Sequence, residues 1–172
     1  KITKILITHW HGDHVLGIPG LLKTMTMNGY NRKLEIYGPK GTKKKVREYF
    51  DMFHNRDEMD LEVYEVWEDV FVDNGKFILE SVPVDHDIPT VAYAFEVKEK
   101  NRIDKKKLKK LKLPNSPLIA ELVKGKSVKI DGKKIDGKKL MYTESSKKIS
   151  FILDTRMTDN LFKIANNSDV LI

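Results

Sequence analysis

The residues best able to do chemistry lie in one short stretch near the start of the chain. His9, His11 and His14 contribute three imidazoles and Asp13 a carboxylate within the run His-Trp-His-Gly-Asp-His. Neutral imidazole and carboxylate are the ligands that zinc and similar divalent metals prefer. Because the whole chain has only five histidines, scattered surface histidines are a poor explanation. We interpret the stretch as a metal-binding segment.

The spacing of these residues indicates how they divide between ions. Side chains at i and i+2 of an extended strand project to the same side, so His9 and His11 could bind one ion. Gly12 lets the backbone turn, after which Asp13 and His14 would face a second position beside the first. The chain contains no cysteine, so any metal must be held by histidine and carboxylate.

Strands and helices alternate around this segment. A β-branched and aliphatic run at residues 2–7 indicates a buried strand that leads into the cluster. A helix follows, with Pro19 in its first turn and Gly29 at its end. Further strands are predicted at residues 34–37, 61–66, 70–72, 77–79, 90–97, 149–153 and 169–172, and further helices at residues 42–54 and 158–165. The hairpin signal Asn74-Gly75 and the alternation predict a mixed α/β (α+β) fold with hairpins and crossovers.

The composition excludes several classes of protein. With 40% hydrophobic and 33% charged residues, the chain is typical of a soluble domain. No run approaches the roughly 18 apolar residues that a membrane span needs, so we expect no membrane partner. Both ends lie inside predicted buried strands. We therefore expect residues 1–172 to be one domain that is incomplete at both ends, a fragment of a longer protein.

The positive charge is concentrated in one segment. The chain has a net charge of +7, and residues 96–139 contain 16 Lys and Arg against 6 Asp and Glu, a local +10 that leaves −3 for the rest. A concentrated basic stretch favours an arm that binds a polyanion. Charge alone is equally compatible with a lysine-rich solvated loop.

The histidine cluster resembles the HxHxDH signature of the metallo-β-lactamase superfamily. That resemblance implies a four-layer αββα sandwich with its metal site at the edge between two sheets. Within the superfamily, residues 8–14, 17–22 and 36–41 resemble ribonuclease Z, the endonuclease that removes the 3′ trailer from precursor tRNA. The resemblance covers nearly the whole chain.

Two later segments, at residues 84–89 and 151–156, resemble further metal motifs of the same family. By this resemblance, His86 joins His9 and His11 on one zinc ion. Asp13 and His14 bind a second ion, and Asp154 bridges the two. Manganese is also compatible with these ligands. His54 lies at the end of a predicted helix, where a protonated imidazole interacts favourably with the helix dipole. We therefore do not include His54 in the metal site.

The chain also departs from the family. Leu153 stands where the family usually has glycine before the bridging aspartate. An upstream acidic strand motif, the final histidine ligand and a downstream histidine that would protonate the leaving group are not present. We therefore expect the second metal position to be weak or empty, and this chain alone to be poorly active or inactive.

The resemblance implies hydrolysis of a phosphodiester. Two metal ions would activate a water for in-line attack, and Asp13 would serve both as ligand and as general base. Arg156 has two open roles, to contact the phosphate or to pair with a neighbouring carboxylate.

The same resemblance assigns residues 98–126 to an inserted RNA-binding arm, because ribonuclease Z carries such an arm between these two motifs. Ile103, Leu108 and Leu111 would form an apolar edge of a short helix within it. The RNA-binding candidates are Lys98, Lys100, Arg102, Lys105, Lys106, Lys107, Lys109, Lys110 and Lys112, together with Arg156. Precursor tRNA as substrate, a homodimer and a cytoplasmic location are implied as well.

Two alternative functions remain open. One is another hydrolase of the same fold acting on a small phosphodiester, thioester or lactone, which would have no use for a basic arm. The other is a catalytically incomplete RNA-binding fragment. That alternative predicts missing ligands, whereas the cluster, His86 and Asp154 are all present.

Overall fold

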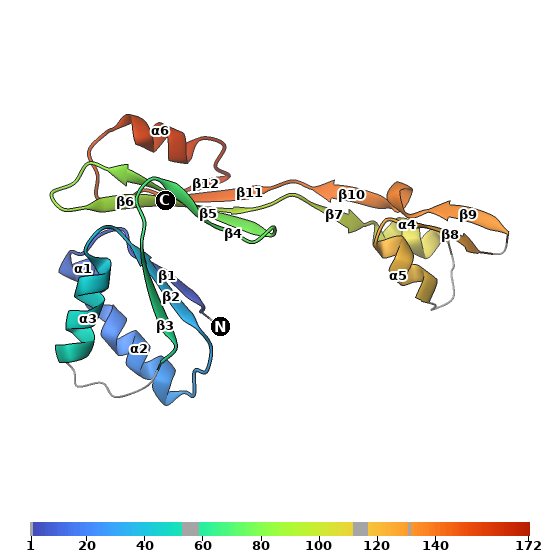
Figure 1. Cartoon of the computed structure of the whole chain (residues 1–172). Helices are drawn as coiled ribbons and strands as arrows, with labels where there is room; N and C mark the ends of the chain where they lie inside the picture. Colours follow the sequence, from blue (N-terminus) through green and yellow to red (C-terminus); the bar gives the residue numbers. More distant parts are fainter. Residues whose placement is uncertain (1, 53–58, 112–116, 131) are drawn as a thin grey trace. The chain divides into compact units, whose positions relative to one another are not determined.

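The computed structural model describes residues 2–52, 59–111, 117–130 and 132–172. The chain divides into two units (Figure 1), the first formed by Lys1–Glu96 with Lys148–Ile172 and the second by Val97–Lys147. The first unit contains the histidine cluster and all the other predicted metal ligands. The second contains most of the basic segment.

The first unit has two sheets. Its elements are β1 (Lys4–Leu6), α1 (Gly12–Val15), α2 (Gly17–Met27), β2 (Leu34–Gly38), α3 (Thr42–Met52), β3 (Leu61–Glu65), β4 (Asp69–Asp73), β5 (Phe77–Val84), β6 (Thr90–Val97), β11 (Lys147–Phe151), α6 (Asp159–Ala165) and β12 (Val170–Leu171). One sheet has the order β1-β2-β3 with parallel pairing, and the other has the order β12-β11-β6-β5-β4. The predicted mixed α/β fold is confirmed.

The helices of this unit are short. The longest, α2 and α3, have 11 residues each, and no helix within the described residues is long and apolar enough to cross a membrane. The helix predicted to end at residue 54 is described as far as Met52, and His54 lies outside the described residues.

Alternation along β2 places this strand between helices and a second sheet. Leu34 and Ile36 are fully buried and pack in one cluster with Leu22 of α2 and Val46 of α3. Successive side chains of a strand point to opposite faces, and Tyr37 accordingly packs on the other side, in a cluster with residues of β6. The helices α1, α2 and α3 therefore cover one face of the three-stranded sheet.

Alternation along β6 completes the layers. Val91 and Tyr93 belong to the cluster between the sheets, whereas Ala92 and Ala94 pack with Ile164 of α6. The order is helices, sheet, sheet, helix, and Figure 1 shows α6 on the outer face of the five-stranded sheet. The predicted αββα sandwich is confirmed.

The predicted hairpin also forms. β4 and β5 pair antiparallel, with an irregularity between Val70 and Val72. Gly75 has φ +77°, a conformation that glycine adopts at little cost. The Asn74 side-chain oxygen accepts hydrogen bonds from the backbone N–H groups of Lys76 and Phe77.

The second unit is larger than the predicted arm. Its elements are β7 (Lys100–Ile103), α4 (Lys105–Lys110), α5 (Pro117–Val123), β8 (Ser127–Ile130), β9 (Lys133–Asp136), the 3₁₀ helix η1 (Gly137–Leu140) and β10 (Met141–Glu144). β7 pairs antiparallel with β10, and β8 with β9. The unit therefore extends beyond residue 126, because the partner of β7 comes from residues 141–144.

The second unit has a small core of its own. Leu122, Val128 and Leu140 are buried together. The predicted apolar edge of residues 103, 108 and 111 packs against them. The three side chains do share one core, but they do not form the edge of one helix: Ile103 ends β7, Leu108 lies on α4 and Leu111 caps it. The lysines of α4 are exposed.

Candidate metal centre

The first histidine lies where the two sheets of the first unit are joined. The Tyr93 hydroxyl donates to the carbonyl of Ile7 at 2.9 Å, and the N–H of Val91 donates to the carbonyl of Thr8, also at 2.9 Å. Both bonds link β6 to the residues that follow β1. His9 comes next, directly after two residues that are bonded to β2 and β6: the N–H of Ile7 also donates to the carbonyl of Tyr37 at 2.8 Å.

The imidazole of His9 is fully buried and incompletely paired. Its Nδ1 lies 3.1 Å from the Thr8 hydroxyl. Its Nε2 has no hydrogen-bond partner among the described residues and lies 3.4 Å from a carboxylate oxygen of Asp154. Burial, together with the neighbouring histidines, lowers the pKa of His9. A buried polar atom without a partner is rare, and a neutral imidazole with a free nitrogen suits a metal ion.

Three histidines form one group that could hold an ion. One ring nitrogen from each of His9, His11 and His86 lies within 4.8 Å of the others. His86 Nε2 and His11 Nδ1 lie 3.1 Å apart. His86 lies 75 positions from His11 in the chain, so the fold brings the two together. The donor set fits a zinc-type ion.

A second group shares the same buried histidine. His9, His14 and Asp154 also place ligand atoms within 4.8 Å of one another, and His14 Nε2 lies 2.8 Å from Asp154 Oδ2. Asp154 has φ +47°, in the left-handed region. That conformation costs a non-glycine residue about 1 kcal/mol or more and is typical of functional sites. The turn here is made by Asp154 itself, after Leu153.

The grouping differs in detail from the predicted ligand sets. His9 belongs to both groups, and Asp154 lies with His9 and His14. Asp13 is in neither group of described residues; its side chain is 80% exposed, with Oδ2 3.5 Å from His14 Nε2. The roles of Asp13 as ligand and base stay predictions.

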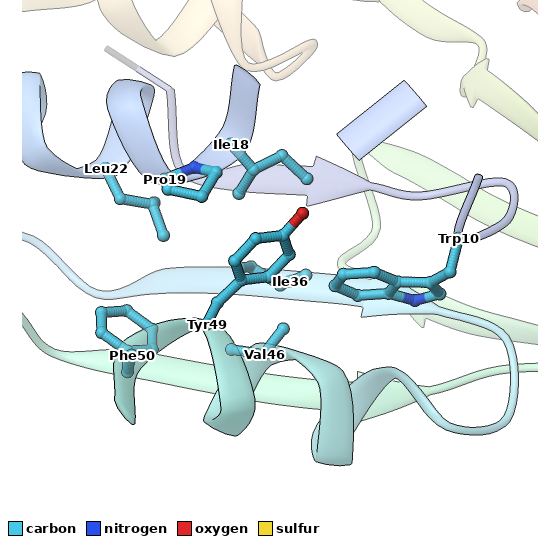
Figure 2. Close-up of a pocket in the computed structure, with 8 residues that line it drawn as sticks. All are labelled: Trp10, Ile18, Pro19, Leu22, Ile36, Val46, Tyr49 and Phe50. Atoms are coloured by element: carbon cyan, nitrogen blue, oxygen red, sulfur yellow. The ribbon is translucent and has the colours of Figure 1, made fainter. Parts of the chain in front are cut away.

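Trp10, between the first two histidines, anchors the segment that carries them to the start of α3. Its indole N–H donates to the buried hydroxyl of Thr42 at 2.8 Å, and that hydroxyl donates to the carbonyl of Pro39 at 2.7 Å. Figure 2 shows Trp10 beside Tyr49 of α3, in a pocket that is also lined by side chains of α2 and by Ile36 of β2. Sequence reasoning missed this role, because the tryptophan and the threonine are 32 residues apart.

Arg156 pairs with carboxylates on both sides of His86. Its guanidinium nitrogens lie 3.4 Å from Asp85 Oδ1 and 3.1 Å from Asp87 Oδ1. Of its two open roles, pairing with a neighbouring carboxylate is therefore present in the structure. A contact between Arg156 and RNA stays a prediction.

Apart from Arg156, the predicted RNA-binding residues lie in the second unit, and those that the structure describes there are mostly exposed. The five lysines of α4 point to solvent, and the helix is capped by Asp104, whose carboxylate accepts hydrogen bonds from the N–H groups of Lys106 and Lys107. Lys100 and Arg102 share one carboxylate, that of Glu144, at 3.4 and 2.9 Å. Lys98 is less exposed, and Lys112 lies outside the described residues.

Comparison with known proteins places this arrangement in a family. The family model described as "Beta-lactamase superfamily domain" matches residues 1–103. Ribonuclease Z of Nanoarchaeum equitans is 37% identical over 171 residues, which is 99% of this chain and 54% of that protein. Ribonuclease Z of Thermoplasma acidophilum is 33% identical over 99% of this chain and 56% of that protein. The chain spans about half the length of the curated relatives it matches.

Solved structures support the same fold. Human tRNase Z, short form, superposes with a TM-score of 0.61 at 20% identity, covering 99% of this chain and 56% of that one. The metallo-β-lactamase fold protein YhfI of Bacillus subtilis superposes with a TM-score of 0.52 at 14% identity, covering 98% of this chain and 47% of that one. At these identities the likeness concerns the fold alone.

Proposed function

Because this chain belongs to the β-lactamase superfamily, we propose that it is part of a zinc-dependent endoribonuclease that cleaves the 3′ trailer from precursor tRNA. The observation that carries the proposal is that one chain combines converging metal ligands with a strongly basic unit of separate fold. The similarity to ribonuclease Z over nearly the full chain supports it.

The family implies binding of a divalent metal, and the donor atoms of this chain fit one. Zinc is proposed because imidazole and carboxylate are its usual ligands, and manganese suits the same atoms. His11 and His86 would hold one ion, His14 and Asp154 another, with His9 between the two groups. When bound, the ions would supply an activated water and neutralise charge on the phosphate.

The side chains of the centre divide the remaining work. The buried His9 would give both groups a fixed reference point, since the two residues before it are hydrogen-bonded to the sheets. Asp13, with its carboxylate exposed beside His14, would orient the attacking water and accept its proton. A carboxylate that must reach a substrate has to be accessible. The side chain of Asp13 is 80% exposed, compared with 46% for Asp154 and 25% for His14.

The second unit would hold the RNA through its backbone. Val97–Lys147 contains 17 Lys and Arg against 6 Asp and Glu. Lysine contacts to phosphates release counterions and make binding strongly dependent on salt. Such contacts position a nucleic acid without reading its sequence. The candidates of the α4 helix are the most suitable, because they are exposed and share one short element.

The assembly and location of the protein are also proposed. A homodimer is expected from the resemblance to ribonuclease Z. A cytoplasmic location agrees with the site of tRNA processing, and the absence of cysteine fits a protein that does not depend on disulfides.

The test separates RNA binding from hydrolysis. In the full-length protein, Lys105, Lys106, Lys107, Lys109 and Lys110 are replaced together by glutamine. Binding of precursor tRNA should weaken, and the slope of log affinity against log salt should flatten by about 0.7 to 0.9 for each phosphate that the variant no longer neutralises. Hydrolysis of a small chromogenic phosphodiester should stay near the wild-type rate. Arginine at the same five positions is the matched control, and it should retain binding.

Three outcomes would contradict the proposal. Equal loss on both substrates would make the second unit a structural element, and an unchanged salt slope would remove it from the RNA interface. A zinc-free preparation of the wild-type chain that takes up no metal on titration would remove the metal centre. In that case the protein would be an RNA-binding fragment without catalysis.

A further inference from the structure

The two loops that carry distant metal ligands are joined to each other. One loop follows β5 and contains His86, and the other follows β11 and contains Asp154. An isolated antiparallel bridge pairs Asp85 with Arg156, and the N–H of Arg156 donates to the carbonyl of Asp85 at 2.9 Å. The bridge lies one residue from His86 and two residues from Asp154.

The side chain of Arg156 extends this link. Its two terminal nitrogens reach different carboxylates, Asp85 Oδ1 at 3.4 Å and Asp87 Oδ1 at 3.1 Å. These aspartates directly flank His86 in the chain. The guanidinium of Arg156 therefore bonds to the residues on both sides of His86, a candidate metal ligand. The backbone of Arg156 belongs to the other loop, which carries Asp154.

We propose that Arg156 is a positioning residue that sets the spacing between the two groups of metal ligands. The inference rests on the metal centre proposed above. His86 belongs to one group, Asp154 to the other, and His9 to both. Because the chain before His9 is bonded to the sheets, the distance between the groups depends on how the two loops are placed against each other, and Arg156 ties the loops through its backbone and its side chain.

Charge gives Arg156 a second effect on the same centre. Asp85 and Asp87 are half or more exposed, and free carboxylates beside the histidines would compete for metal or repel a phosphate. A guanidinium that pairs with both holds them in place and offsets part of their negative charge. Lysine offers a single point charge and cannot span two acceptors in a fixed plane, so Arg156→Lys should not restore the wild-type geometry.

The experiment measures metal binding rather than turnover. Zinc-free chain is titrated with cobalt(II), and the absorption spectrum reports ligand geometry while competition with zinc reports affinity. Arg156→Met should lower metal affinity about 10- to 100-fold, the usual effect of losing a residue that orients ligands, and should alter the cobalt spectrum. The backbone bridge does not need the side chain, so the fold should be retained.

A matched control comes from the second unit. Arg102 makes a similar exposed contact, with Glu144 at 2.9 Å, and Arg102→Met should leave the cobalt titration unchanged. Asp87→Asn should weaken metal binding in the same direction as Arg156→Met, and the double variant should cost less than the two single changes combined, because the residues act together.

Each remaining outcome overturns a defined statement. Wild-type chain that binds no cobalt or zinc overturns the metal centre itself. Wild-type binding with an Arg156→Met variant of equal affinity and identical spectrum overturns the positioning role alone. An Arg156→Met variant with unchanged metal binding and weaker binding of tRNA by the full-length protein would make Arg156 an RNA contact instead.

Discussion

The two units of this protein differ in charge and in the size of their cores. Val97–Lys147 has a net charge of +11, which leaves −4 for the rest of the chain. The first unit packs three clusters of buried side chains between its layers, whereas the second packs one. Metal ligands must be held at fixed positions by well-packed neighbours. Contacts to phosphates need only exposed charged side chains on a folded unit. The division of charge agrees with the proposed division of work between metal binding and RNA binding.

Because of this difference, substitutions in the two units should impair different properties of the protein. A change in the first unit should affect metal binding and hydrolysis of any substrate. A change in the second should affect the binding of RNA and its dependence on salt. Four predictions, in order of decreasing expected effect, test how strictly the two kinds of effect are separated.

The largest effect is expected at His9. Its one free nitrogen can bind a single ion, but the imidazole lies beside both ligand groups. His9→Ala should therefore weaken metal binding at both positions, by deleting a ligand of one ion and leaving a buried cavity beside the other, whereas His11→Ala should affect one. After dialysis, His9→Ala should contain less metal at both positions than the wild-type protein. Turnover by the full-length protein should fall by more than about 10³-fold, since metal ions supply several kcal/mol of transition-state stabilisation. If His9→Ala kept both ions and an unchanged circular dichroism spectrum, the importance of His9 to both ligand groups would be contradicted.

Asp13 should show a smaller but specific loss. Asp13→Ala is measured in the full-length protein with excess zinc, so that metal occupancy matches the wild type. If Asp13 is the general base, kcat should stay about 10²- to 10⁴-fold lower while affinity for RNA is unchanged. His14→Ala is the control and should recover more fully. A return of Asp13→Ala to wild-type kcat would leave Asp13 as a ligand only.

Core truncations should separate the stability of the two units. Ile36→Ala in the first core and Leu140→Ala in the second each remove a buried aliphatic side chain and should cost about 2–5 kcal/mol locally. Hydrogen exchange should locate the loss in the first unit for Ile36→Ala and in the second for Leu140→Ala. Only Leu140→Ala should spare hydrolysis of a small phosphodiester. Loss of protection throughout the chain in both variants would show that the units unfold as one.

The smallest effect is expected at the cap of α4. Asp104→Ala removes the acceptor for two backbone N–H groups and should destabilise the helix by about 1 kcal/mol. Asp104→Asn keeps a capping side chain and removes the same charge, so a comparison of the two variants isolates the cap. Binding of tRNA should be weaker in the alanine variant by up to about 5-fold. Equal affinities would mean that helical order in α4 does not matter for RNA.

Local patterns in the sequence determined much of the fold. Alternation in β2 and β6 encodes which face meets a helix and which meets the other sheet, because the side-chain period of a strand is fixed by its geometry. Asn74-Gly75 encodes a turn through the conformational freedom of one glycine. The imidazoles of the first cluster are recognisable for the same reason, since their spacing along the chain is short.

The tertiary structure decided how distant residues combine. Nothing near His9 in the chain indicates that it belongs to two groups, that Asp154 takes a left-handed conformation, or that Arg156 spans the aspartates beside His86. The extent of the second unit follows likewise from the pairing of β7 with β10. These features depend on contacts between segments tens of residues apart, which leave no periodic trace in the sequence and exist only once the layers have packed.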